Sequence, residues 1–246
     1  TDAQRRYRLC VRVNGNFQLG SSARLDAFGR GLGNNGINEL IRGTLGGQRA
    51  EESGTILPVP NRSTYGSITA PEQLGRGGDW GGSNIRMGGG AIWVEVSGES
   101  RLDGQLLANP GTAQQADVTP HHGSGGSIYV RTGLLRGSGL LDASNGDPTA
   151  YGGGGRVALI VTGQTDFAAV TLRAYGGGAG PGAAGTVYQE HAGHSPGRGV
   201  LIIDNNNQVV GYYPQPYYTY GVTLLPDASN GGPVDLGQFA EIIVTN

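Results

Sequence analysis

The sequence predicts an all-β fold, a right-handed parallel β-helix (a solenoid) whose coils meet at glycine-rich corners. The first supporting observation is a recurring phrase: a leucine, any residue and an alanine, followed by a turn rich in Gly or Asn. The second is an alternating apolar and polar segment before each copy, which is typical of a strand. From residue 91 onward the strand pair returns about every 30 to 36 residues, a period typical of solenoids, where each unit buries its apolar face against its neighbours. The copies are Leu25-Asp26-Ala27, Leu106-Leu107-Ala108, Leu141-Asp142-Ala143 and Leu172-Arg173-Ala174.

Composition supports this fold class and excludes several functions. Glycine supplies 48 of 246 residues, nearly a fifth, against a usual share of about 7%. Because alternating Ile, Val and Tyr segments separate the glycines, they indicate tight turns rather than disorder, and we expect positive φ angles at the corners. The net charge of −2 leaves no basic surface for nucleic acid. No apolar run approaches the roughly 18 residues of a membrane span, and Cys10 has no cysteine to pair with.

The first coil is expected in the N-terminal segment. Residues 7–13 alternate apolar and polar, Asn14-Gly15-Asn16 signals a turn, and residues 17–19 and 23–27 complete the coil. Because the chain begins almost directly in a strand and without Met, we expect it to be part of a longer polypeptide, with an uncovered N-terminal coil. The long strands of the later coils are expected at 91–96, 127–132, 156–161 and 186–190.

A long insert, residues 29–89, interrupts the period. A short helix is predicted from Ile37 to Leu45, because its apolar residues have helical spacing. Asn61-Arg62-Ser63 is an N-glycosylation sequon, which makes Asn61 a glycosylation candidate. A loop of this length usually carries a function or packs over a face of its scaffold.

The pattern weakens after the last long strand. Residues 200–204 keep the spacing of a short strand but lose the alanine. The stretch from Tyr212 to Tyr218 is rich in Tyr and Pro, so it cannot continue a central strand. We therefore predict a β-helix domain over 1–205 and a C-terminal cap or linker over 206–246, with short strands at 222–225 and 241–244.

Several segments resemble the glycine-rich β-helical segments of large secreted and cell-surface proteins. The resemblance covers roughly residues 7–205. It implies a right-handed parallel β-helix in an extracellular setting, and it implies no activity. The insert and the Tyr/Pro tail depart from the pattern. The similar segments are Leu25-Asp26-Ala27, Tyr65 to Pro71, Gly125 to Val130, Gly185 to Tyr188 and Leu201 to Asn205.

Right-handed β-helices include polysaccharide lyases and hydrolases, so the acidic residues were considered as catalysts. Asp26 and Asp142 occupy equivalent positions of the repeat, but Leu107 and Arg173 occupy that position in the neighbouring coils. The two carboxylates are therefore expected about two coils apart, where neighbouring coils stack about 4.8 Å apart. This spacing suits neither a retaining nor an inverting pair, and we assign no catalytic residue.

The histidines form two pairs in glycine-rich corners, His121-His122 and His191-x-x-His194. If both pairs share one edge of the solenoid, they could hold zinc together with Glu190 or Asp117. Solvated loop histidines are the alternative, and we favour it. Asn145-Gly146-Asp147 could bind calcium, but it lacks the nonapeptide spacing of the calcium-binding roll.

Period-2 alternation predicts which side chains of the long strands share a face. We expect an interior column of Val11, Val94, Val130, Leu159 and Val187, and outward columns of Cys10, Trp93, Tyr129, Ala158 and Tyr188, and of Arg12, Glu95, Arg131, Ile160 and Glu190. Either the insert folds over the aromatic column, or Trp93, Tyr129 and Tyr188 form a contact strip for a neighbouring subunit or for sugar rings.

Two functions fit these patterns. The first is a structural or adhesive extracellular module, a subunit of a filament or cell-surface assembly that contacts protein neighbours, including copies of itself, through its ends or outer face. The second is a carbohydrate-active enzyme or carbohydrate-binding domain on the same fold. We assign no cofactor, and calcium is the one candidate left open.

Overall fold

The computed structural model describes residues 8–33, 45, 51–52, 64–78, 86–112, 123–145, 152–177, 182–207, 218–219, 223, 225 and 236–245. These residues are mostly in β structure, and the one helical element among them is the 3₁₀ turn η2 (Leu236–Gln238). The predicted helix at 37–45 lies outside the described residues except for Leu45, which is a buried bend. Within the described part of the chain, no helix is long and apolar enough to cross a membrane.

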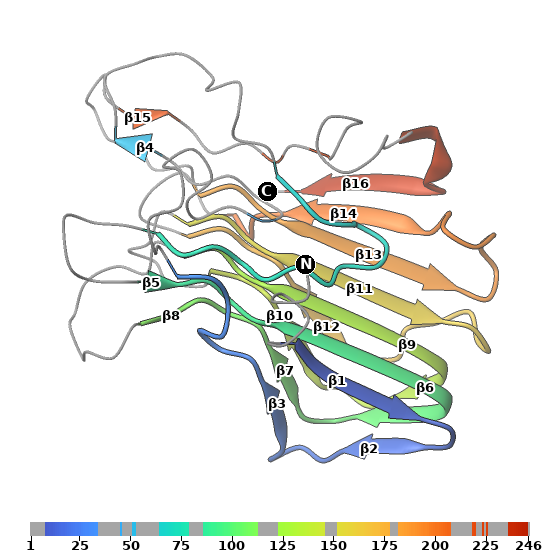
Figure 1. Cartoon of the computed structure of the whole chain (residues 1–246). Helices are drawn as coiled ribbons and strands as arrows, with labels where there is room; N and C mark the ends of the chain where they lie inside the picture. The colour runs from blue at the N-terminus through green and yellow to red at the C-terminus, as the bar shows by residue number, and fades with distance from the viewer. Residues whose placement is uncertain are drawn as a thin grey trace.

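The larger sheet contains the long strands in the order β1-β6-β9-β11-β13-β14-β16, with β2 also paired to β6 (Figure 1). Its neighbours are parallel from β1 to β13, so successive long strands lie side by side and run in one direction. These strands are β1 (Arg8–Val13), β2 (Phe17–Leu19), β6 (Ala91–Leu102), β9 (Ser127–Arg136), β11 (Arg156–Val161), β13 (Thr186–His191), β14 (Val200–Asp204) and β16 (Glu241–Thr245).

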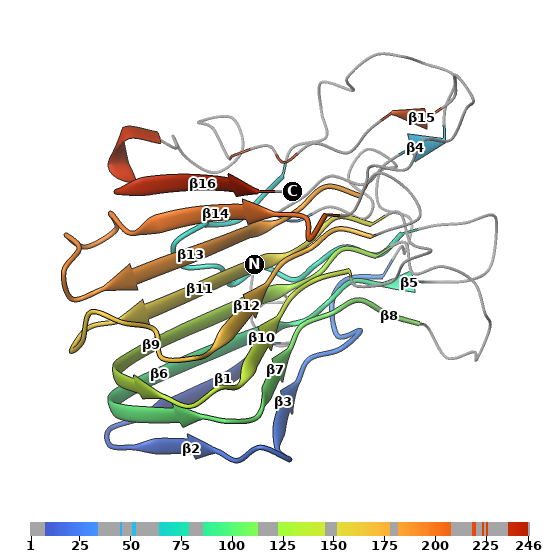
Figure 2. The same ribbon diagram turned by 180° about the vertical axis from the view of Figure 1, so that it is seen from behind.

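The smaller sheet contains the short strands in the order β12-β10-β7-β3, all in parallel pairs. Each short strand follows a long strand in the chain, and Figure 2 shows this sheet in front of the larger one. The chain therefore passes from the larger to the smaller sheet and back in each repeat. The short strands are β3 (Arg24–Asp26), β7 (Gln105–Leu107), β10 (Leu140–Asp142) and β12 (Thr171–Arg173).

Two antiparallel pairs of short strands lie outside these sheets. β4 (Glu51–Glu52) pairs with β15 (Tyr218–Thr219), and β5 (Arg86–Met87) pairs with β8 (Gly111–Thr112). The first of these pairs joins the insert to the C-terminal segment. Of the predicted C-terminal strands, 241–244 is confirmed as β16, whereas Thr223 and Leu225, the described residues of 222–225, are not in a strand.

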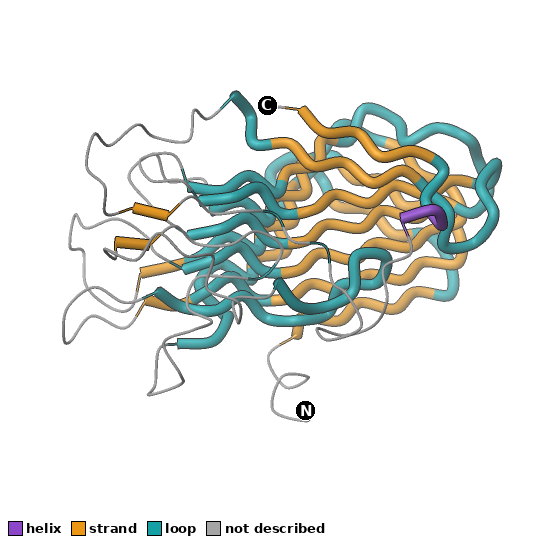
Figure 3. Tube along the Cα trace, turned by 90° about the horizontal axis from the view of Figure 1, so that it is seen from above, coloured by secondary structure: helices purple, strands orange, loops and turns teal. Residues whose placement is uncertain are grey.

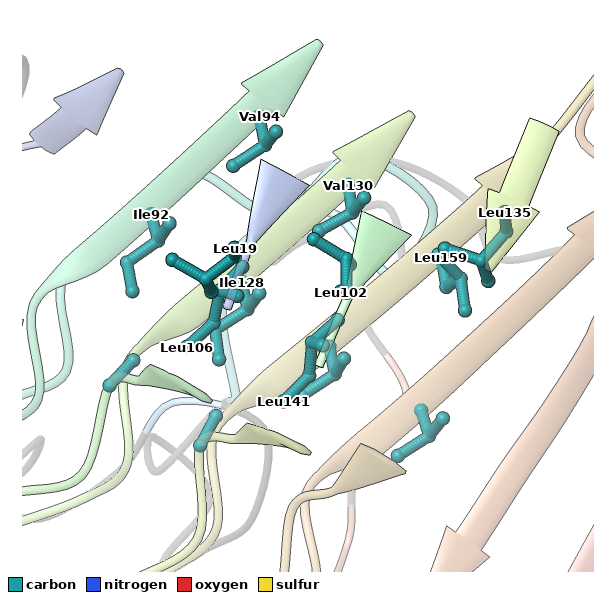
Figure 4. Close-up of a cluster of buried hydrophobic side chains, with 14 of the residues drawn as sticks. Leu19, Ile92, Val94, Leu102, Leu106, Ile128, Val130, Leu135, Leu141 and Leu159 are labelled. Carbon is teal, nitrogen blue, oxygen red and sulfur yellow. The ribbon is translucent and has the colours of Figure 1, made fainter. Parts of the chain in front are cut away.

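The core lies between the two sheets and follows the columns predicted from the repeat. Leu25, Leu106, Leu141 and Leu172 are paired in register across the smaller sheet, and the alanine two positions later is buried in every copy. Ile92, Val94, Ile128, Val130 and Leu159 meet these leucines from the larger sheet (Figure 4). Both predicted interior columns of the short segments, the leucines and the alanines, are confirmed.

The long strands extend further than predicted in two coils. β6 and β9 continue beyond Val96 and Thr132, with a shift of register between Val96 and Glu99. In the first coil, a turn separates β1 from β2, which pair with the two halves of β6. In the next two repeats, β6 and β9 each remain one continuous strand, and β6 has one extra residue relative to β9 at the register shift.

The prediction for 200–204 as a short strand of a fifth coil is wrong. β14 pairs antiparallel with β13 in the larger sheet and parallel with β16. The connection reverses the chain through two turns, His194 N–H to His191 C=O and Arg198 N–H to Ser195 C=O, and Gly197 has φ +76°. The turn places β14 alongside β13 in the larger sheet. The sequence spacing of the repeat could not show that β14 leaves the smaller sheet.

The role predicted for the corner glycines is also wrong. Positive φ occurs at Gly29, Gly66, Gly137 and Gly197 among the described glycines, and not at the paired glycines before the long strands. Those pairs instead let backbones approach closely: Gly126 N–H bonds to Ala108 C=O at 2.7 Å, and Gly155 N–H to Ala143 C=O at 2.9 Å. Figure 3 shows the corner segments as stacked traces beside the strand ends.

Candidate functional site

The outer face of the larger sheet carries the predicted columns. Cys10, Trp93, Tyr129, Ala158 and Tyr188 are in register from β1 to β13, and so are Arg12, Glu95, Arg131, Ile160 and Glu190. The interior column is confirmed from Val11 to Leu159, but Gln189 follows Leu159, and Val187 instead pairs with Val157. The alignment of Val187 was therefore wrong by two residues, which leaves its face unchanged because side chains alternate with period 2.

The aromatic column is largely covered. Tyr129 and Tyr188 are buried, whereas Trp93 is half-buried. Trp93 stacks on Tyr129 with ring centroids 3.9 Å apart, and the Arg8 guanidinium lies 4.9 Å from the centre of the Trp93 ring. Arg8 and Tyr129 come from β1 and β9, the two strands beside β6, so neighbours from both sides contact the indole ring.

Two segments provide the cover. Ile68, from the described insert segment 64–78, packs with Tyr129 and Ala158 in a second apolar cluster, and Phe239 packs edge-on against Tyr188 at 6.1 Å. The segment 64–78 crosses the face of the sheet opposite to the short strands, as the cyan trace in Figure 1 shows. The contacts therefore support the account in which the insert covers the column.

Polar contacts hold the insert segment on this face. Arg8 pairs with Glu72 at 2.5 Å, and Ser127 Oγ donates to the carbonyl of Gln73 at 2.6 Å. Burial raises the pKa of Tyr129, which keeps its hydroxyl protonated. The cover is thus attached to both β1 and β9.

The second outward column is charged and exposed at its N-terminal end. Arg12 Nε lies 2.8 Å from Glu95 Oε2 across neighbouring strands, and Arg131 follows in the register. The Arg12 side chain is 68% exposed. Such an exposed pair contributes about 0–1 kcal/mol to the free energy of unfolding, so this column adds little to the stability of the fold.

His191 and His194 lie at the end of β13, where their rings stack 3.8 Å apart. Nδ1 of His194 accepts the N–H of His191 at 3.2 Å, and Nδ1 of His191 accepts the N–H of Gly193 at 3.0 Å. The Nδ1 lone pair of each ring is therefore engaged by a backbone N–H and is not free to bind zinc. Burial lowers the pKa of His194, and the neighbouring His191 adds to this shift.

Glu190 is occupied by hydrogen bonds of its own. Its Oε2 accepts the Tyr188 hydroxyl at 2.5 Å and the N–H of Gly197 at 2.7 Å. Burial, followed by the bond to Glu190, raises the pKa of Tyr188. These contacts fix the β13–β14 turn, and among the described residues no group of three or more His, Cys, Asp or Glu side chains could hold a metal ion.

The remaining predicted positions are apart or outside the described residues. Asp26 and Asp142 are separated by Leu107 in the ladder, and each accepts a backbone N–H two residues later, Phe28 at 2.9 Å and Ser144 at 2.8 Å. They therefore act as local turn residues. Asn61, Asp117, His121, His122, Gly146 and Asp147 lie outside the described residues.

The strands β1, β2 and β3 form an open end of the two sheets within the described part of the chain. β1 and β2 pair with β6, and β3 pairs with β7, but none of the three has a described partner on its other side. Val11 and Leu25 are half-buried, whereas Val94 and Leu106, their partners one coil inward, are fully buried. In the described part of the chain, the interior columns are thus less covered at this end than one repeat further in.

Arg156 was not recognised as special from the sequence, although it is fully buried at the first position of β11. Its ladder partners are Ser127 on β9 and Thr186 on β13, and Ala91 on β6 pairs with Ser127. The same column begins with Arg8 on β1, so the signal available in the sequence was an arginine between the small residues Ser127 and Thr186.

No protein-family model matches the chain, and neither the curated proteins nor the solved structures contain a match.

Proposed function

We propose that this chain is a structural or adhesive module of an extracellular assembly, built as a right-handed parallel β-helix that joins its neighbours through its coil ends. Strand pairs in register across two sheets support the β-helix, and parallel crossovers are almost always right-handed. The sequence resemblance to secreted and cell-surface proteins supports the extracellular setting.

The open first coil is the observation that carries this proposal. No described residue pairs with the outer edges of its strands, and its interior side chains are less buried than Val94 and Leu106 in the next repeat. Unpaired edges of a parallel ladder favour the addition of another strand, and a half-covered core favours another apolar coil. The occupant that we propose is a coil of a second copy of this chain.

The outer face gives less support to a carbohydrate enzyme or binding domain. Sugar rings stack on open aromatic faces, but Tyr129 and Tyr188 are buried and Trp93 lies between Arg8 and Tyr129. Asp26 and Asp142 are engaged in turns and separated by a coil. No described feature favours this second function.

The test is association at the open end. Sedimentation velocity and electron microscopy over a range of concentrations should show end-to-end oligomers, and Val11→Lys should disperse them with little loss of melting temperature. The lysine stem can pass along the open end and place its charge in water. The matched variant Val94→Lys, one coil inward, should unfold the protein, because its charge would be buried.

Two results would contradict the proposal. One is a monomer at every concentration. The other is association that persists unchanged in a folded Val11→Lys protein.

A further inference from the structure

Arg156 lies beneath the insert segment, on the outer face of the larger sheet. It starts β11 and shares a face with Ala158 and Ile160, which belong to the covered apolar cluster. The side chain has no exposed surface. A charged group is therefore held in an apolar layer between the sheet and the segment 64–78.

The hydrogen bonds of Arg156 leave part of its guanidinium unused. Nε donates to the carbonyl of Tyr65 at 3.0 Å, and Nη1 donates to Thr186 Oγ1 at 2.8 Å. Nη2 is buried and has no hydrogen-bond partner. Both acceptors are neutral, so these bonds do not compensate the charge.

A second guanidinium lies beside the same tyrosine. The Arg76 guanidinium lies 5.3 Å from the centre of the Tyr65 ring, and its Nε is also buried without a partner. Ser124 fixes the Arg76 backbone through two hydrogen bonds, from Arg76 N–H to its Oγ at 3.0 Å and from its own N–H to Arg76 C=O at 2.9 Å. Arg76 and Arg156 thus each have an unused hydrogen-bond donor, and both side chains contact Tyr65.

The cluster contains no compensating negative charge among the described residues. No described carboxylate forms an ion pair with Arg76 or Arg156. Tyr65 is neutral, because burial raises its pKa and its hydroxyl donates to the carbonyl of Leu74 at 2.6 Å. Burial lowers the pKa of Arg156 to about 10, so the guanidinium stays charged at neutral pH. A buried charge without a partner is strongly unfavourable.

We propose that Nη2 of Arg156 and Nε of Arg76 form a binding site for a small oxyanion, a carboxylate or a phosphate group. Arginine donors bind both groups through their oxygen atoms. Arg76 is half-buried and forms the solvent side of the site, whereas Arg156 forms its floor. Binding would attach the insert segment, through Arg76, to β11, through Arg156. The site is independent of association at the open end.

The experiment compares acetate, inorganic phosphate and chloride at equal ionic strength. For the wild-type chain we expect calorimetry to detect binding of acetate, phosphate or both. At roughly tenfold excess over the dissociation constant, the melting temperature should rise by about 3–5 °C. Binding of acetate alone would identify a carboxylate site, and binding of phosphate alone a phosphate site.

Three variants locate the effect. Arg156→Met should abolish the rise, whereas Arg131→Met, which removes an exposed arginine of the neighbouring strand β9, should retain it. Arg76→Gln, at the more exposed residue, should weaken the affinity about tenfold, which provides a test even if Arg156→Met does not fold.

The proposal would be overturned if neither acetate nor phosphate bound the wild-type chain. It would also be overturned if chloride raised the melting temperature as much as the oxyanions, or if a folded Arg156→Met protein kept the full response. Oligomer formation should be the same with and without phosphate, so failure of this site leaves the proposed function unaffected.

Discussion

Gly125 lies directly against the backbone of Ala143 in the neighbouring short segment. A Cβ built on Gly125 would stand 1.7 Å from the carbonyl oxygen of Ala143. The same relationship recurs one coil away on each side, where Gly89 faces Ala108 at 1.8 Å and Gly154 faces Ala174 at 1.9 Å. The alanine of the repeated phrase and a glycine of the corner before the preceding long strand therefore form one packing unit.

Replacing this glycine should destabilise the fold strongly. In Gly125→Ala, the new methyl group would meet a backbone carbonyl rather than a movable side chain, so we expect a loss of at least about 3 kcal/mol in the free energy of unfolding. Denaturant unfolding followed by circular dichroism measures it. Gly15→Ala is the matched control, because no atom lies within 4 Å of its added Cβ. Equal stability of the two variants would show that the corners do not pack closely.

The alanine side of the unit should tolerate little extra volume. Ala143 is fully buried, so Ala143→Leu should overpack the corner and cost about 1–3 kcal/mol. The exposed Ala23 allows a control, since Ala23→Leu should change the melting temperature very little. If Ala143→Leu melts like the parent protein, the alanine column is not interior.

The cover over the aromatic column predicts the effect of removing a ring. Tyr129→Ser should cost about 3–5 kcal/mol, since it removes a buried ring that contacts Trp93 and the insert. Phe28→Ser removes a ring that is 47% exposed and should cost far less. Thermal unfolding compares the two. A Tyr129→Ser protein of unchanged stability but weakened association would instead favour a contact strip.

The lowered pKa of His194 predicts a pH dependence of stability. Its folded pKa lies below the value of 6.5 expected when unfolded, so the unfolded chain takes up the proton first. The stabilisation is present above pH 6.5 and decreases as the pH falls toward the folded pKa. The expected loss arises because burial disfavours the charged form of the ring, and the neighbouring His191 adds to this effect.

The measurement is the melting temperature between neutral and mildly acidic pH. His194→Asn keeps an acceptor near the Nδ1 position but does not titrate, so its curve should be flatter than that of the parent. Parallel curves for the two proteins would show that His194 does not contribute to the acid sensitivity.

The sequence by itself determined the repeating part of this protein. The leucine and alanine columns, the five long strands and the outward register of Trp93, Tyr129 and Tyr188 all followed from spacing and alternation. These features are local, because a residue's place in a repeat and its face of a strand depend on its own segment and on the equivalent segments.

The tertiary structure decided what lies on each face and where the repeat ends. The hairpin of β13 with β14 depends on a turn at Gly197, and the burial of Arg156 depends on a segment about 90 residues earlier in the chain, with Tyr65 as its partner. The reason for the corner glycines is likewise a contact between coils rather than a backbone angle. Such contacts join distant segments, and no periodic pattern within one sequence records them.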